Sequence, residues 1–274
     1  MLTHDPEPMT DSLETTLETA RLAAAAAAEV HRAHGRSVTI DDATEKGRAD
    51  YVSATDLAAQ EACLAIIRDR HPEHAIMAEE DAAGGEEIVI PNGPVWVVDP
   101  LDGTANFLHN HPMHAASVAL AIDGTPVVGA VYCAPTDEHW WAARGHGAWK
   151  NGQSIGVSSI TKGDHALVGT GFPFKSESLL EEYAGQLARV LAAAGGVRRG
   201  GAAALDLCYL AEGRFDAFWE LFLNPWDFAA GWVIIEEAGG VMSSVGAGPL
   251  SLSPGSVMSA NSTSMLDALS RLLA

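Results

Sequence analysis

Two aspartates stand close together in the stretch "WVVDPLDGTANF", which runs from Trp96 to Phe107. Asp99 and Asp102 follow an apolar run that is typical of a buried strand, so both carboxylates are expected at its carboxyl end, where α/β proteins place ligand sites. Burying carboxylates costs free energy unless a cation neutralises them, and no basic residue is near them in the sequence. The pattern indicates a metal site, with an ordinary polar Asp-Pro-x-Asp-Gly turn as the alternative.

A Gly-Thr pair follows the second aspartate, at the point where we expect the chain to turn into a helix. The backbone N–H groups of Gly103 and Thr104 would then point outward and form a cradle for an anion. Carboxylates for a hard cation beside N–H groups for an anion predict a metal-bound phosphate.

Two other segments add carboxylates. Glu79 and Glu80 follow the apolar run of "HAIM" at a predicted strand end, and Asp227 stands at a predicted helix start after Pro225-Trp226. Each is unremarkable alone, since a Glu pair is usually a solvated face and an Asp at a helix start is usually an N-cap. Together they form an oxygen-rich ligand set without histidine, which suits Mg²⁺ or Mn²⁺ rather than zinc.

Hydrophobic periodicity and Gly-rich turns predict the elements that position these residues. Helices are expected at 11–34, 55–70 (with Thr55 or Asp56 as N-cap), 178–194, 202–212, 227–238 and after Asn261; strands are expected at 95–98, 115–122, 127–133, 139–149, 166–171 and 215–219. Asp123-Gly124 predicts a hairpin. The result is a mixed α/β chain, a single domain over 1–274 with possible subdomains 1–149 and 150–274.

Composition excludes several function classes. The formal charge of −20 comes from 36 acidic against 16 basic residues without a basic run, which excludes nucleic acid or an anionic membrane as the main partner. This acidity fits either high-salt adaptation or an acidic proteome. Cys63, Cys133 and Cys208 form no C-x-x-C motif and are expected in the core, which indicates a reducing compartment. With no signal peptide or membrane span in the sequence, we expect a cytoplasmic protein.

These motifs resemble the inositol monophosphatase family of magnesium-dependent, lithium-sensitive phosphatases. The family's D-P-x-D-G-T-x-N-F is intact at 99–107, its acidic pair corresponds to Glu79-Glu80, and its W-D-x-A-A-G corresponds to 226–231. The resemblance runs from about residue 12 to the end of the chain. It implies a layered αβαβα sandwich, a small-molecule phosphate ester as substrate, inhibition by lithium and a homodimer.

The resemblance also implies the metal ligands. Glu79, Asp99 and the carbonyl of Leu101 would hold one Mg²⁺, and Asp99, Asp102 and Asp227 would hold a second. Two or three Mg²⁺ ions are implied for each active site, with Mn²⁺ as a possible substitute. Paired cations ~3.5–4 Å apart can activate a water, stabilise the leaving alkoxide and clamp the phosphate oxygens.

Four residues are implied in the handling of the attacking water. Thr104, with Glu79, would position it; Asp56 matches the partner that orients the threonine, and Lys46 matches a basic position near the metals. For Asp56, a plain N-cap remains the alternative.

The chain departs from the family pattern at two points. Ala78 replaces the glycine before the acidic pair, and His111 replaces an aromatic residue, which leaves three histidines at 109, 111 and 114. A zinc site is the alternative for these histidines, but no cysteine or fourth ligand is near, and we favour a loop at the rim of the active site.

Substrate choice is expected to depend on the segment "VRRGGAAALDLCYLAEGRFDAFWE". The substrate-binding residues implied are the cradle of Gly103 and Thr104, the small residues Gly201, Ala202 and Ala203, then Glu220 for a ring hydroxyl and Arg198 for a second phosphate. Without the resemblance, the interpretation of Glu220 would be an ordinary charged residue at the end of a strand.

The predicted function is Mg²⁺-dependent hydrolysis of a phosphate monoester, with inositol monophosphate as the substrate. Fructose 1,6-bisphosphate, which the pair Arg198-Arg199 could accommodate, and histidinol phosphate are the alternatives within the family. A non-catalytic, metal-binding regulatory protein on the same fold is the alternative from a different class. An intact Thr104 beside a complete ligand set argues against it.

Overall fold

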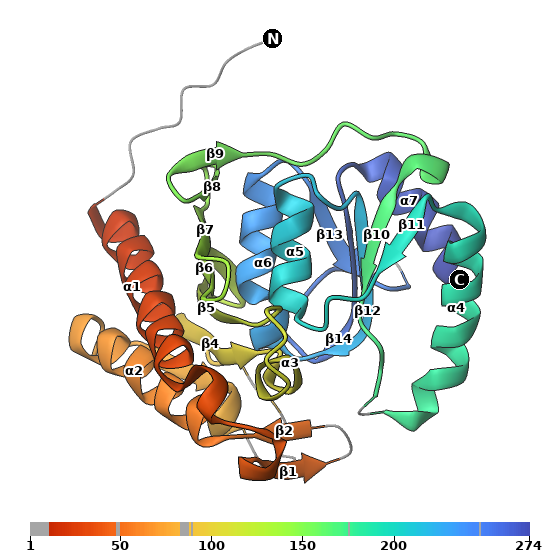
Figure 1. Cartoon of the computed structure of the whole chain (residues 1–274). Helices are drawn as coiled ribbons and strands as arrows, with labels where there is room; N and C mark the ends of the chain where they lie inside the picture. Colours follow the sequence, from red (N-terminus) through yellow and green to blue (C-terminus); the bar gives the residue numbers. More distant parts are fainter. Residues whose placement is uncertain (1–10, 48–49, 83–87, 89, 175, 247) are drawn as a thin grey trace.

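The computed structural model describes residues 11–47, 50–82, 88, 90–174, 176–246 and 248–274. Its elements stack in five layers, helix pair, sheet, helix pair, sheet, helix pair (Figure 1). The helix pairs are α1 (Asp11–His34) with α2 (Ala54–Arg70), α5 (Ala203–Ala211) with α6 (Pro225–Glu237), and α4 (Leu180–Ala193) with α7 (Thr263–Leu273). The αβαβα sandwich is therefore confirmed.

The first sheet has seven strands in the order β3-β4-β5-β6-β7-β8-β9. They are β3 (Ala75–Ala78), β4 (Pro94–Asp102), β5 (Ala115–Ile122), β6 (Thr125–Cys133), β7 (Glu138–Ala143), β8 (Ala148–Lys150) and β9 (Gln153–Ile155). β3 runs parallel to β4, with Ala78 beside Val98, whereas the other neighbours are antiparallel. Because Ala78 pairs with Val98 in this parallel ladder, the next residues along each chain, Glu79 and Asp99, lie side by side where β3 ends.

β4 extends further than the sequence predicts and carries both aspartates within it. Asp99 pairs with Ser117 and Asp102 with Ala115, so two residues of β4 face one residue of β5. This is a β-bulge, which bends a strand and re-aims its side chains. Pro100 lies in the bulge, where its missing N–H costs no ladder hydrogen bond. The short helix α3 (Thr104–Leu108) follows at once.

The second sheet has five strands in the order β11-β10-β12-β14-β13. They are β10 (Leu167–Thr170), β11 (Gly196–Arg198), β12 (Ala217–Leu223), β13 (Val241–Ser244) and β14 (Gly255–Ala260); a separate hairpin joins β1 (Thr44–Gly47) to β2 (Asp50–Val52). Short 3-10 helices include η3 (Glu79–Asp81), which directly follows β3.

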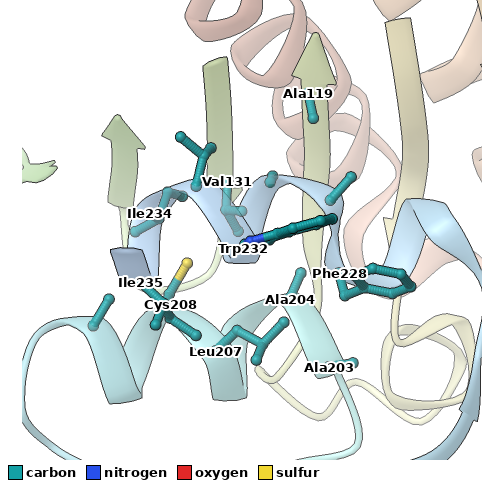
Figure 2. Close-up of a cluster of buried hydrophobic side chains, with 14 of the residues drawn as sticks. Ala119, Val131, Ala203, Ala204, Leu207, Cys208, Phe228, Trp232, Ile234 and Ile235 are labelled. Carbon is teal, nitrogen blue, oxygen red and sulfur yellow. The ribbon is translucent and has the colours of Figure 1, made fainter. Parts of the chain in front are cut away.

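The middle layer is buried from both sides. Every residue of α5 is buried, and so are most residues of α6. A helix covered by a sheet on each face has no polar stripe, which explains why most residues of both helices are apolar. In Figure 2, Leu207 and Cys208 rise from α5 toward α6, which carries Trp232, and Val131 approaches α6 from the first sheet. The N-termini of α5 and α6, where the candidate site lies, are therefore held in place by packing on both faces of the two helices.

The outer layer of α1 and α2 packs on the other face of the first sheet. α1 contributes alanines with no exposed surface, including Ala20, Ala24 and Ala27, which let the helix approach the strands closely. The three cysteines are buried and free, as expected of core residues. Within the described residues, no helix has the length and apolarity needed to cross a membrane.

Several local predictions are wrong. The N-cap of α2 is Ser53, not Thr55 or Asp56. The expected strand 139–149 is two strands, β7 and β8, because the chain turns at Gly145 and Gly147, which have positive φ angles of 80° and 73°. The two sheets separate between residues 155 and 167, but the division into subdomains stays a prediction.

Candidate active site

A pocket of about 260 Å³ opens where the bulge of β4, the end of β12 and the N-termini of α5 and α6 meet. Most of the site residues predicted from the sequence line it. They are Glu79, Asp99, Leu101, Asp102, Gly103, Thr104, Gly201, Ala203, Glu220 and Asp227. Residues far apart in the sequence thus reach one cavity.

Asp99 lies at the centre of the acidic residues and is only 1% exposed. One of its oxygens, Oδ1, accepts a hydrogen bond of 2.9 Å from the N–H of Leu101. Burial raises the pKa of Asp99 well above its usual range, and the nearby carboxylates of Glu79, Asp102 and Asp227 raise it further. The cluster therefore holds more negative charge than it can stabilise, which is the condition that a bound cation relieves.

Backbone N–H groups at helix N-termini hold two of these carboxylates. Oδ2 of Asp102 accepts from the N–H of Ala204 at 2.7 Å, and Oδ2 of Asp227 accepts from the N–H of Asn224 at 2.7 Å. Asn224 is the N-cap of α6 and Asp227 is its third residue, so the pair forms a capping box. Each aspartate is thereby fixed by one oxygen at the wall of the pocket.

The donor set fits a hard divalent cation by its chemistry. Its members are carboxylates with the Leu101 carbonyl, and such oxygen sets are typical of Mg²⁺ sites. As the side chains stand, the described residues include no group of three or more His, Cys, Asp or Glu residues already arranged as metal ligands.

Thr104 and Asp56 form a hydrogen-bonded pair beside the acidic residues. The Thr104 hydroxyl lies 2.8 Å from Oδ1 of Asp56 and 3.1 Å from the Leu101 carbonyl, and it can donate its proton to either. Oδ2 of Asp56 accepts from the N–H and the hydroxyl of Ser53 at 2.8 and 2.6 Å. Asp56 is thus not the N-cap of α2 but the N3 residue of its capping box, and it binds Thr104 as well. Burial raises its pKa, against the effect of these hydrogen bonds.

Two glycines let the loops at the pocket approach each other. Gly103 has φ of 88°, and a Cβ there would lie 2.8 Å from the Met113 carbonyl. Gly201 has φ of 86°, and a Cβ there would lie 2.5 Å from Nη1 of Arg199. Asn106 bridges the loops by donating to the Gly200 carbonyl at 3.0 Å. Both glycines line the pocket, as an anion cradle requires.

Glu220 faces the acidic residues from β12. Burial raises its pKa well above the usual range, Asp206, Asp227 and Asp102 raise it further, and Arg199 opposes the shift. A Cβ at Gly171 would overlap the Glu220 carboxyl group, so glycine is required there for Glu220 to keep its place. Glu220 is therefore a pocket residue and not an exposed strand-end charge.

Besides Asp56, three of the predicted site residues lie outside the pocket lining. Arg198 is exposed, donates to the carbonyl of its neighbour Val197 at 3.0 Å and does not line the pocket. Ala202 is 1% exposed and lies behind Gly103, outside the lining. Lys46 is also outside the lining; its Nζ lies 2.6 Å from Oε2 of Glu80.

The sequence reasoning missed an aromatic side of the pocket. Arg199 takes the place expected for Arg198, with its guanidinium 5.3 Å from the ring centre of Phe172 and 5.2 Å from that of Phe174. Phe222 lines the same pocket, is 57% exposed and has a positive φ of 61°, which is rare for a bulky residue. The aromatic run "GFPF" after the strand predicted at 166–171 was the one available signal.

The comparisons with known proteins agree with this geometry. The Inositol monophosphatase family matches residues 12–273. The inositol-1-monophosphatase of Synechocystis sp. is 41% identical over 251 residues, 91% of this chain and 85% of that protein. The fructose-1,6-bisphosphatase/inositol-1-monophosphatase of Aquifex aeolicus is 39% identical over 236 residues, 86% and 88% of the two chains.

Two further similarities are informative. The Nus factor SuhB of Escherichia coli is 38% identical over 220 residues, which cover 80% of this chain and 81% of that protein. The solved inositol monophosphatase of Anabaena (Nostoc) sp. superposes with a TM-score of 0.81 at 36% identity, over 96% of each chain.

Proposed function

This chain belongs to the inositol monophosphatase family of phosphatases, and on that premise we propose that its pocket hydrolyses inositol monophosphate with Mg²⁺ as the cofactor. The observation that carries the proposal is that the acidic residues around Asp99 share one cavity with Thr104, whose hydroxyl is hydrogen-bonded to Asp56 behind the lining. The first group suits a cation and the second suits an attacking water.

Membership of the family implies which of these oxygens are the metal ligands. Glu79, Asp99 and the Leu101 carbonyl would hold one Mg²⁺, and Asp99, Asp102 and Asp227 would hold a second. When bound, Mg²⁺ supplies positive charge that neutralises the phosphate, acidifies a water and stabilises the leaving alkoxide.

The chain's own residues orient the reactants. The Thr104 hydroxyl donates to Asp56 at 2.8 Å, which leaves its oxygen lone pairs free to accept a hydrogen bond from the attacking water. Glu79, on the neighbouring edge of the pocket, is placed to bind the same water. The backbone of Gly103 and Thr104 supports the phosphate oxygens at the start of α3.

Substrate recognition falls to the opposite wall. Glu220 is placed to accept a hydrogen bond from a hydroxyl of the inositol ring, while Gly201 and Ala203 leave space for the ring to approach the backbone. A hydrogen bond from the substrate is most favourable to a buried carboxylate such as this one, because water no longer supplies its hydrogen bonds.

A sugar bisphosphate is the second candidate, and two observations favour it. Arg199 lines the pocket, and the described residues place no carboxylate within ion-pair distance of it. The Aquifex aeolicus relative carries the name of a fructose-1,6-bisphosphatase as well as an inositol-1-monophosphatase. Histidinol phosphate has no such support.

A regulatory role is the candidate from another class, because several relatives are named Nus factor SuhB. The hydrogen-bonded Thr104–Asp56 pair supports an enzyme, since metal binding alone would not need it. A homodimer, a cytoplasmic location and the absence of nucleic acid or membrane partners remain part of this proposal.

Two variants assayed on two substrates test the choice of substrate. Glu220→Gln should lower kcat/KM for inositol 1-phosphate by about 1–3 kcal/mol of transition-state binding, since it removes an ionic hydrogen bond. Arg199→Gln should leave inositol 1-phosphate hydrolysis within about twofold and should raise KM only for fructose 1,6-bisphosphate. Native efficiency of Glu220→Gln on inositol 1-phosphate, with a strong Arg199→Gln defect on the bisphosphate, would reverse the assignment.

A further inference from the structure

A buried histidine of α1 contacts the bulge that carries the two aspartates. His31 is 2% exposed, and its Nε2 lies 2.9 Å from the carbonyl oxygen of Pro100. A carbonyl oxygen can only accept, so Nε2 carries the proton and donates it. α1 packs on the opposite face of the first sheet from α5 and α6, so the histidine reaches the bulge from outside the pocket.

The peptide between Pro100 and Leu101 is anchored at both ends. Its carbonyl accepts from His31, and its N–H donates to Oδ1 of Asp99 at 2.9 Å. Because a peptide unit is planar, the direction of its carbonyl fixes the direction of its N–H. The bond from His31 therefore determines where the Asp99 carboxylate finds its hydrogen-bond donor.

The surroundings hold the His31 ring in this direction. His114 packs against it edge-on with 5.4 Å between ring centres, and Phe107 lies at 6.1 Å. Nδ1 of His31 has no hydrogen-bond partner in the described part of the chain, so Pro100 is the acceptor that orients the ring. The Pro100 carbonyl sits in a bulge, where the regular strand ladder is interrupted, and thus depends on a donor from elsewhere.

We propose that His31 is a positioning residue that orients the Asp99 carboxylate for the metal, acting through the Pro100–Leu101 peptide. It touches neither substrate nor metal. The inference rests on the proposed metal-dependent function, since it assigns Asp99 as a ligand. Hydrogen bonds behind metal ligands typically contribute about 10–100-fold to metal affinity, because they preset the ligand's orientation.

A matched pair of variants isolates the hydrogen bond. His31→Gln keeps an N–H donor on a side chain of similar reach, whereas His31→Met has similar length and no donor. His114→Phe is the control, because it replaces a buried imidazole in the same cluster that makes no hydrogen bond to the bulge. Mn²⁺ binding to the full-length chain, followed by electron paramagnetic resonance, gives a dissociation constant without an activity assay.

The expected result is a dissociation constant raised about 10-fold or more in His31→Met, and within about threefold of native in His31→Gln and His114→Phe. Added Mg²⁺ should recover most of the turnover of His31→Met, which separates weaker metal binding from damaged chemistry. Equal Mn²⁺ affinity in the Met and Gln variants would overturn the inference and leave the proposed function standing. A native chain that does not bind Mn²⁺ would overturn both.

Discussion

Replacing Asp99 by asparagine should separate folding from metal binding. The asparagine side chain can still accept the Leu101 N–H through its amide oxygen, so the bulge keeps that hydrogen bond. The change removes the negative charge of Asp99, which is unfavourable because the residue is buried and because the carboxylates of Glu79, Asp102 and Asp227 repel it. Without metal, Asp99→Asn is therefore expected to be at least as stable as the native chain.

With bound metal, the native chain should be more stable than Asp99→Asn. A ligand that binds only the folded state at about 100 times its dissociation constant adds about 2.7 kcal/mol to the free energy of unfolding. For a chain of this size 1 kcal/mol shifts Tm by about 2–4 °C, so Mg²⁺ should raise the native Tm by about 5–11 °C. Asp99→Asn loses the proposed shared ligand, and its Tm should rise by less than about 2 °C.

Differential scanning calorimetry in EDTA and in excess Mg²⁺ measures both effects on the same samples. Asp164→Asn, which removes one charge from an exposed site outside the pocket, is the matched control and should respond to Mg²⁺ like the native chain. An Asp99→Asn chain that gains as much Tm from Mg²⁺ as the native one would refute the assignment. So would a clear loss of its metal-free stability, because the carboxylate would then be stabilising by itself.

Three further outcomes are expected. Thr104→Ala should reduce kcat by about 10²–10⁴-fold while Mn²⁺ affinity stays native, and Thr104→Ser should retain more activity because it keeps the hydroxyl; equal turnover of the two variants would remove Thr104 from the chemistry. His114→Phe should reduce the loss of stability of the metal-free chain at acid pH. Burial lowers the pKa of His114 to about 4 in the folded chain, whereas the ordinary histidine pKa of 6.5 applies to the unfolded chain, which therefore binds more protons. The free energy of unfolding of the native chain thus falls as the pH drops from 6.5 to 4, by about 2 kcal/mol at pH 5. Urea unfolding at pH 8 and 5 measures this, and an unchanged pH dependence of the variant would contradict it. Lithium should inhibit phosphate release in a way that added substrate relieves poorly, and indifference to high Li⁺ at saturating Mg²⁺ would contradict the proposed geometry of the cation sites.

The sequence predicts the site better than its surroundings. Local motifs identify Asp99, Asp102 and Asp227, because the first two follow a strong strand signal and the third stands at a strong helix start. The meeting of Glu79 with Asp99 depends on parallel pairing of β3 with β4, and strand pairing is not encoded locally. Short elements such as β1, β2, β11 and β14 escape prediction because their few residues carry no periodicity.

The errors around the substrate wall have a different physical cause. Strand β11 ends at Arg198, so choosing between Arg198 and Arg199 requires knowing where the strand stops and how the chain turns toward the pocket after it. His31 is on the polar-looking last turn of α1, and only the packing of that helix on the first sheet brings it to Pro100. Neither contact could be inferred without the tertiary fold.

Phosphate release from inositol 1-phosphate tests the central claim most directly. The purified chain is treated with EDTA, assayed, and assayed again after addition of millimolar Mg²⁺, with Asp99→Asn beside it. Since every assigned ligand atom is an oxygen, the account predicts no release after chelation, full recovery with Mg²⁺ in the native chain, and none in the variant. Undiminished release from a rigorously metal-free sample, or no release at any Mg²⁺ concentration, would contradict it.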